Sequence, residues 1–169
     1  MNALLAADAP GQGGQYLTFM LGGELYALGI LAIKEIIEYS GVSTVPMMPA
    51  AIRGVINLRG AAVPVLDLAA RFGRPASEIG KRSCVIIVEV NAHGGQQVIG
   101  VMVDAVNAVL QIDAADIEPA PGFGARIRSD FIAGMGKVNG KFVILLDVDS
   151  VLSGAAAEQL ALLDQPLPA

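Results

Sequence analysis

Short runs of apolar residues, separated by glycine and proline turns, recur along the chain and predict an all-β fold. Residues 15–21 and 25–29 flank a glycine-rich turn and predict an N-terminal β-hairpin. Residues 54–68 repeat the pattern around Arg59-Gly60, and residues 131–148 repeat it around Asn139-Gly140. An Asn-Gly pair favours the type I′ turn of a tight hairpin. Between these hairpins, residues 84–90, 97–104 and 105–112 predict further strands.

Residues 30–37 fit two local structures. Ile30, Ile33, Ile36 and Ile37 have helical spacing, with Lys34 and Glu35 as polar positions. The same run also fits a bent strand that follows a turn. The pattern leaves both structures open, and in either one we expect the four isoleucines to lie in the core.

The chain contains an internal repeat. A shift of 80 residues aligns 54–68 with 134–148 without a gap, and a shift of 73 residues aligns 26–37 with 99–110. The identical positions in the first alignment are Gly54/Gly134, Gly60/Gly140, Val63/Val143, Leu66/Leu146 and Asp67/Asp147. Short strands with glycine corners lose their free edges by closing into small barrels, so we expect two similar five-stranded barrels.

The repeat predicts a domain organisation. We expect a flexible tail over residues 1–13, a first lobe over about 14–80, a second lobe over about 82–153 and a C-terminal helix and tail over 154–169. The sequence leaves open which barrel contains the strand at residues 15–21.

Composition narrows the function classes. The 169 residues are 54% hydrophobic and 16% charged, which is typical of a globular protein. A net charge of −5 makes nucleic acid an unexpected partner. One cysteine and one histidine cannot form an internal disulfide or a typical zinc site, and we expect no cofactor. No signal peptide or membrane-spanning run is evident, so we expect a cytoplasmic protein.

The two copies differ at informative positions. Glu35 aligns with Ala108, and Arg59 aligns with Asn139. A hairpin tip forms well with Asn-Gly, so folding does not require an arginine there. Arg59 is therefore the foremost candidate for a binding residue. A solvated hairpin arginine, or a surface ion pair between Glu35 and Arg59 worth at most about 1 kcal/mol, is the alternative interpretation.

Four segments follow one another along the chain: GGELYALGILAIKEII, VPMMPAAIRGVINLRGAAVPVLDL, VIGVMVDAVNAVLQIDAADIEPAPGF and FIAGMGKVNGKFVILLDV. In this order they resemble the CheW family of chemotaxis coupling proteins. The resemblance implies two packed SH3-like five-stranded barrels. It also implies a non-enzymatic adaptor that joins the cytoplasmic tip of methyl-accepting chemoreceptors to the histidine kinase CheA.

The resemblance also implies site residues. Glu35, Arg59 and Ile33 match positions associated with receptor coupling, and Val42, Arg53 and Phe123 match kinase-contact positions. We further expect an amphipathic receptor helix to line a seam between the two lobes.

Two other functions stay open. The chain could be the regulatory lobe of a larger chemotaxis kinase, or a small β-barrel hydrolase that uses Asp67, Asp104 or Asp147. Asp67 and Asp147 each follow a strand at equivalent repeat positions, so we interpret both as helix N-caps.

Overall fold

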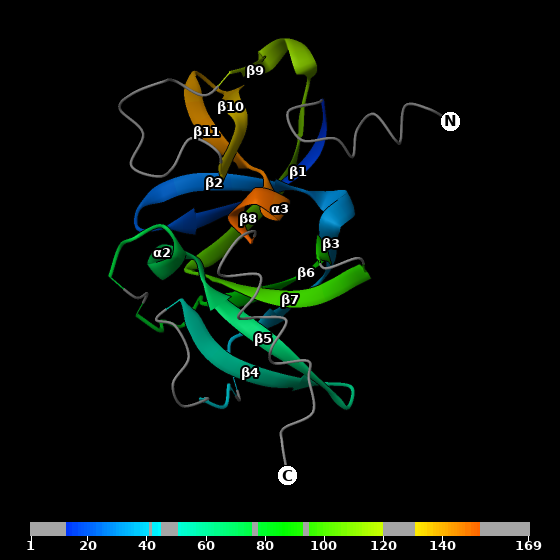
Figure 1. Cartoon of the computed structure of the whole chain (residues 1–169). Helices are drawn as coiled ribbons and strands as arrows, with labels where there is room; N and C mark the ends of the chain where they lie inside the picture. Colours follow the sequence, from blue (N-terminus) through cyan, green and yellow to red (C-terminus); the bar gives the residue numbers. More distant parts are fainter. Residues whose placement is uncertain are drawn as a thin grey trace.

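The protein is a pair of twisted β-sheets packed against each other, with only short helices (Figure 1). The computed structural model describes residues 13–40, 42–44, 51–75, 78–92, 95–119 and 131–152. Each sheet curls around its own apolar cluster, which confirms the predicted all-β fold of two small barrels. Residues 1–12 of the tail predicted at 1–13, and the whole of the C-terminal helix and tail predicted at 154–169, lie outside the described residues.

One sheet has six strands in the order β8-β1-β2-β11-β10-β9. Its strands are β1 (Gly14–Leu21), β2 (Glu24–Gly29), β8 (Ala105–Ile112), β9 (Ile117–Glu118), β10 (Ile132–Val138) and β11 (Lys141–Leu146). Neighbouring strands in this sheet are antiparallel, except for β11 and β2, which run parallel.

The other sheet has five strands in the order β3-β6-β7-β5-β4. Its strands are β3 (Ile33–Glu38), β4 (Ile52–Leu58), β5 (Ala61–Asp67), β6 (Cys84–Ala92) and β7 (Gly95–Val103). β5 and β7 pair in parallel, as β11 and β2 do in the six-stranded sheet.

The two copies of the repeat exchange their first hairpins. β1 and β2 from the first copy join the six-stranded sheet with β8, β10 and β11, while β6 and β7 from the second copy join β3, β4 and β5. The sheets therefore do not follow the predicted division at residues 80–82. The repeat shows which segments are equivalent, but strand pairing across copies is a non-local choice that it does not specify.

Local irregularities recur in both copies. A bulge lies at Lys34, where β3 pairs with β6, and at the equivalent Asn107, where β8 pairs with β1. A chain segment then closes each barrel against the strand that begins the second hairpin: Ser43 bridges Val55 of β4, and β9 pairs with β10. The repeat is thus preserved in the bulges as well as in the strands.

Gly54 shows why glycine is identical in both copies. A Cβ atom at Gly54 would lie 2.0 Å from the Ser43 carbonyl oxygen of the closing segment, and the residue has φ +149°. A Cβ atom at Gly134 would lie 2.7 Å from the side chain of Ile117 in β9. Each glycine admits the closing segment to the barrel.

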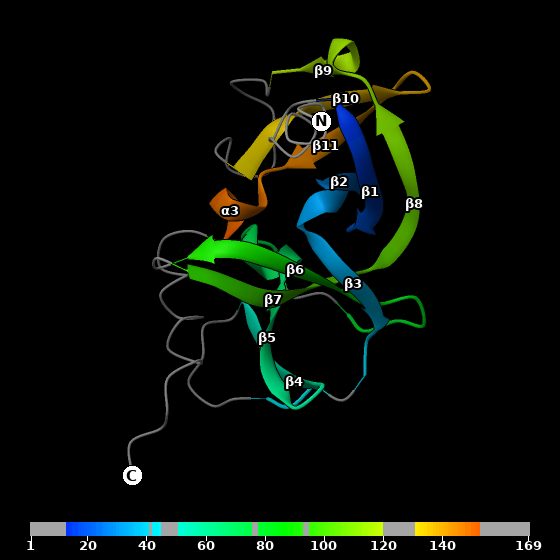
Figure 2. The ribbon, with the colours of Figure 1, turned by 90° about the vertical axis from the view of Figure 1, so that its right-hand side faces the viewer.

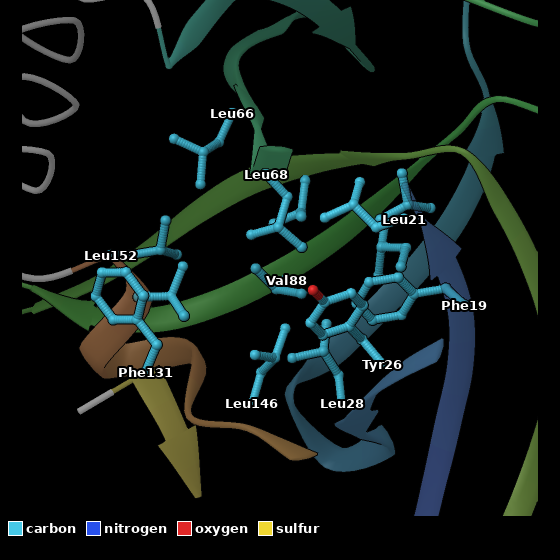
Figure 3. Packing of buried hydrophobic residues seen from close by; sticks show 14 of the residues in the cluster. Phe19, Leu21, Tyr26, Leu28, Leu66, Leu68, Val88, Phe131, Leu146 and Leu152 are labelled. Carbon is cyan, nitrogen blue, oxygen red and sulfur yellow. The ribbon is translucent and has the colours of Figure 1, made fainter. Parts of the chain in front are cut away.

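The main hydrophobic core lies between the sheets (Figure 3). Phe19 and Tyr26 of the six-stranded sheet stack with ring centroids 6.0 Å apart, and Tyr26 meets Phe72 at 5.7 Å. Leu66 and Val88 contribute from the five-stranded sheet. Because β1, β2, β6 and β7 are covered on both faces, their sequences are almost continuously apolar.

Short helices and 3-10 turns connect or follow the strands. Residues 30–37 form a 3-10 turn, η1 (Ile30–Ala32), followed by β3, so the bent strand after a turn is correct and the helix is wrong. The helices α2 (Leu68–Arg71) and α3 (Val148–Val151) each follow the second hairpin of a copy. A further 3-10 turn, η2 (Ala114–Asp116), connects β8 to β9.

Candidate interaction site

Arg59 occupies the tip of the β4–β5 hairpin in a conformation that arginine rarely adopts. Its φ is 53°, and Gly60 follows with φ 86°, so both central turn residues have positive φ. This is the backbone of a type I′ turn, which suits Asn-Gly. The Asn57 side chain supports the turn by accepting a hydrogen bond from the Gly60 N–H at 2.8 Å. The left-handed conformation costs a non-glycine residue about 1 kcal/mol or more, so Arg59 is held there against its own preference.

Glu35 lies next to this tip. The bulge at Lys34 shifts the register of β3, so that Glu35 pairs with Ile87. The Arg59 guanidinium donates from Nη2 to Glu35 Oε2 at 2.6 Å. The Arg59 side chain is 73% exposed and that of Glu35 is 27% exposed. Two residues that differ between the copies are therefore joined in one ion pair at the surface, which the sequence had left open as an alternative.

Apolar side chains lie beside the ion pair on β3. Ile33 pairs with Val88 and Ile36 pairs with Ile86, and both partners belong to the core between the sheets. Ile33 is half-buried against this core, while Ile36 is 42% exposed. The sequence pattern favoured a buried Ile36, so its exposure was missed.

The second copy has the same apolar row on β8. Val106 is the counterpart of Ile33 and is also half-buried against the core. Val109 is the counterpart of Ile36 and is 53% exposed. Both β3 and β8 therefore carry apolar residues past the edge of the core. The alignment of the two copies, which matches Ile36 with Val109, could have identified these two residues as equivalent.

The seam between the sheets is not an open groove along its length. The main core fills it with side chains such as Leu28, Leu66 and Val101, all of them buried. The prediction that an amphipathic receptor helix lines this seam stays a prediction. Among the described residues, Ile36 on β3 and Val109 on β8 are exposed apolar side chains on the edge strands of the two sheets.

The kinase-contact candidates have different surroundings. Val42 is half-buried and packs against the cluster inside the five-stranded barrel. Arg53 is mostly buried, lies 3.6 Å from the Asp67 carboxylate and places its guanidinium 5.8 Å from the centre of the Tyr39 ring. Phe123 lies outside the described residues. Val42 and Arg53 are thus on the same barrel as Glu35 and Arg59, with little of Arg53 exposed.

The carboxylates considered for catalysis have structural partners. Asp67 accepts a hydrogen bond from the Ala70 N–H and Asp147 accepts one from the Ser150 N–H, each at 3.3 Å, which confirms both as helix N-caps. Asp104 accepts from the Gly22 N–H at 2.8 Å and so anchors the β1–β2 turn. These three aspartates serve the backbone at three separate turns or helix starts.

Titration and metal binding add no further chemistry among the described residues. Burial raises the pKa of the Tyr16 hydroxyl above its ordinary value of 10.0. Within the described ranges, no cluster of three or more His, Cys, Asp or Glu side chains could hold a metal ion. Likewise, none of the helices formed by the described residues is long and apolar enough to span a membrane.

The fold defines a tandem β-barrel protein that carries the Arg59–Glu35 ion pair on its surface. The family model for the CheW-like domain matches residues 15–156. The chemotaxis protein CheW of Klebsiella aerogenes is 36% identical over 160 residues, which cover 95% of this chain and 91% of that protein. The crystal structure of the scaffolding protein TtCheW from Thermoanaerobacter tengcongensis matches with a TM-score of 0.76 at 34% identity, covering 86% of this chain and 96% of that chain.

More distant relatives extend the comparison. The chemotaxis protein CheW of Rhizobium meliloti is 32% identical over 146 residues, covering 86% of this chain and 92% of that protein. Protein FrzA of Myxococcus xanthus is 27% identical over 162 residues, covering 95% of this chain and 97% of that protein. The chain belongs to the CheW-like family.

Proposed function

We propose that this chain is a non-enzymatic chemotaxis adaptor that couples the cytoplasmic tip of chemoreceptors to the histidine kinase CheA. The observation that carries the proposal is Arg59, an arginine held in a left-handed conformation at an exposed hairpin tip and paired with Glu35. Arg59 is strained at an exposed position, whereas Asn139 occupies the equivalent tip of the other copy with little strain. This difference favours a binding role for Arg59 over a folding role. The family relationship supplies the kind of process, chemotaxis.

The chemistry of the patch suits a receptor helix. Arg59 uses one of its guanidinium nitrogens on Glu35 and is 73% exposed, so it has further N–H donors for carboxylates or carbonyl oxygens of a partner. Ile33 and Ile36 provide apolar surface on the adjacent strand. An amphipathic helix with an acceptor near its apolar stripe would engage both features. We assign receptor binding to Glu35, Arg59 and Ile33, with Ile36 as an added contact.

A second surface would serve the kinase. Val42 and Arg53 lie on the five-stranded barrel, and the segment around Phe123 follows β9 in sequence. Because Arg53 is tied to Asp67, we expect Val42 to contribute more direct contact than Arg53. Arg53 would act mainly by holding the adjacent strand ends in place. An adaptor of this kind would work at the cytoplasmic side of receptor arrays.

The three carboxylates considered for a hydrolase already accept hydrogen bonds from backbone N–H groups, which disfavours that alternative. General acid and base groups need to converge on one substrate position. Asp67, Asp104 and Asp147 instead accept backbone hydrogen bonds at separate turns or helix starts. The adaptor function requires no such convergence.

Binding to a soluble receptor cytoplasmic fragment tests the receptor half of the proposal. We expect saturable capture of the chain at micromolar concentrations, because contacts combined in arrays need not be tight individually. The Arg59→Ala variant should lose most of this capture while keeping its circular dichroism spectrum. No capture of the wild-type chain at tens of micromolar would reject receptor coupling.

Calorimetry with the isolated CheA regulatory domain tests the kinase half separately. We expect a saturable complex that Val42→Asp weakens and Arg59→Ala leaves intact. Capture by the receptor without any kinase complex would redefine the chain as a receptor-capping protein.

A further inference from the structure

The two hairpin tips that share a backbone conformation differ in what supports them. Arg59 and Gly60 form the loop between β4 and β5, because Leu58 pairs with Ala61 on either side of them. The N–H groups of such a two-residue loop have no partner across the strands and are available to other acceptors. The Asn57 side chain accepts from the Gly60 N–H at 2.8 Å, which ties the second loop residue back to β4.

The β10–β11 tip cannot have the same support. The counterpart of Asn57 is Lys137, whose ammonium group donates hydrogen bonds but cannot accept one. The Asn139-Gly140 loop nevertheless has almost the same conformation, with φ of 52° and 79°. A tip with asparagine in its first position therefore adopts this turn without an acceptor on the preceding strand.

The cross-strand neighbours differ between the copies as well. Asn57 pairs with Ala62, an exposed residue with a small side chain, so the amide group has room to turn back over the loop. The first copy thus combines an arginine in a left-handed conformation, an acceptor two positions before it and a small residue opposite that acceptor. At the counterparts Asn139, Lys137 and Phe142 the second copy has none of these features.

We propose that Asn57 is a positioning residue for Arg59. Its hydrogen bond to Gly60 offsets the strain of a left-handed arginine and so keeps the guanidinium where it meets Glu35. Without this bond the arginine regains its preference for negative φ, and a change of φ at residue 59 turns the whole side chain in another direction. Asn57 acts through the loop backbone, and the inference rests on the proposed function only where receptor affinity is concerned.

The second copy provides an internal control. In Figure 2 the β4–β5 hairpin lies in the lower part of the molecule and the β10–β11 hairpin in the upper part, so the two tips are far apart. Asn139 therefore reports on the integrity of the fold in every variant of the first tip.

The nuclear Overhauser effect (NOE) between the amide and α protons of residue 59 tests the position of Arg59 without a receptor. These two protons are closest at a φ such as that of Arg59, so the wild type should give a strong NOE at residues 59 and 139. Asn57→Ala should weaken the NOE at residue 59 and leave that at 139 unchanged. Asn57→Asp keeps an acceptor oxygen and should give the strong NOE. Arg59→Asn added to Asn57→Ala should also restore it, because asparagine tolerates the left-handed conformation.

The same exchange can be made in the second copy. Asn139→Arg should lose the strong NOE at residue 139, since Lys137 offers no acceptor. Adding Lys137→Asn together with Phe142→Ala reproduces the first copy and should restore the NOE. This series decides the question even where Asn57→Ala fails to fold.

Receptor-fragment affinity measures the consequence for binding. Asn57→Ala should weaken it about threefold to tenfold, because a smaller fraction of the molecules has the arginine in place. The matched variant Lys137→Ala should keep the wild-type affinity, and Asn57→Asp most of it.

Three results would overturn the proposal. They are a strong NOE at residue 59 in Asn57→Ala, a strong NOE at residue 139 in Asn139→Arg, and a receptor affinity that Asn57→Ala leaves unchanged. A wild-type chain that binds no receptor fragment would reject the proposed function instead, and the two NOE series would still decide whether Asn57 positions Arg59.

Discussion

Arg59 and Asn139 have the same backbone conformation at equivalent hairpin tips, with φ values of 53° and 52°. Asparagine adopts this left-handed conformation readily, whereas arginine does so only at a cost. The neighbouring glycines are also equivalent, with φ of 86° at Gly60 and 79° at Gly140. Asn139 thus shows which kind of residue suits this hairpin tip, and Arg59 differs from it.

Gly54, in β4, is predicted to be the least replaceable of the described glycines that have positive φ. Gly54→Ala places a methyl group 2.0 Å from the Ser43 carbonyl oxygen and keeps an unfavourable φ, so we expect a loss of about 3 kcal/mol or more. Gly60→Ala is the control, because it also has positive φ but no atom within 4 Å of the new methyl group. It should cost about 1 to 2 kcal/mol in urea denaturation. Equal losses in the two variants would show that the Ser43 segment does not close the barrel tightly.

Asp67 and Asp147 are expected to differ in stability despite their identical capping role. Asp147→Ala removes one N-cap and should cost about 0.5 to 2 kcal/mol. Asp67→Ala also removes the carboxylate beside the mostly buried Arg53 guanidinium and should cost about 3 kcal/mol or more.

A double-mutant cycle with Arg53→Ala isolates that second contribution. The double variant should be less destabilised than the sum of the two single variants. Additive losses would mean that the ion pair, at 3.6 Å, contributes nothing to the difference.

The exchange of hairpins predicts how fragments behave. A fragment of residues 1–80 contains β1 and β2 without their partners β8 and β11, so it should show no cooperative unfolding transition. Mixed with residues 81–169, it should regain the β-sheet circular dichroism spectrum of the intact chain. Cooperative folding of residues 1–80 alone would contradict the observed strand order.

Tyr16 predicts a destabilisation at alkaline pH. Burial raises the pKa of its hydroxyl in the folded state, so the unfolded chain loses the proton first. Its contribution to stability is complete below pH 10 and is lost as the pH rises through the folded pKa. Tyr16→Phe should therefore lose less stability than the wild type between pH 9 and 11. Parallel stability curves for the two proteins would exclude this effect.

The sequence predicted the local features of the fold well, because they depend on nearby residues. The hairpin turns and the caps at Asp67 and Asp147 are determined within a few residues of the chain. The repeat also identified Glu35 and Arg59 as the positions where folding alone explains least. Exposure of Ile36 was missed because the apolar pattern of β3 is the same for a covered and an uncovered strand face.

The division into lobes could not be predicted for a different reason. The first hairpins of the two copies have the same pattern of apolar residues, so the pattern fits each hairpin to either sheet. The choice depends on the path from β2 through η1 to β3, which carries the chain from one sheet to the other. That path is a property of packing over the whole molecule.

The central claim is that Arg59 is retained for binding at a cost in stability, and the Arg59→Asn variant tests it most directly. Asparagine relieves the left-handed strain, as Asn139 does in the other copy, but cannot form the ion pair with Glu35 or offer a guanidinium to a partner. We predict an unchanged or higher thermal midpoint together with a loss of receptor-fragment affinity of about tenfold or more, typical of a truncated arginine hot spot. Glu35→Ala, measured in parallel, should also weaken binding and change stability by at most about 1 kcal/mol. A midpoint many degrees lower for Arg59→Asn, or receptor affinity equal to that of the wild type, would contradict the account.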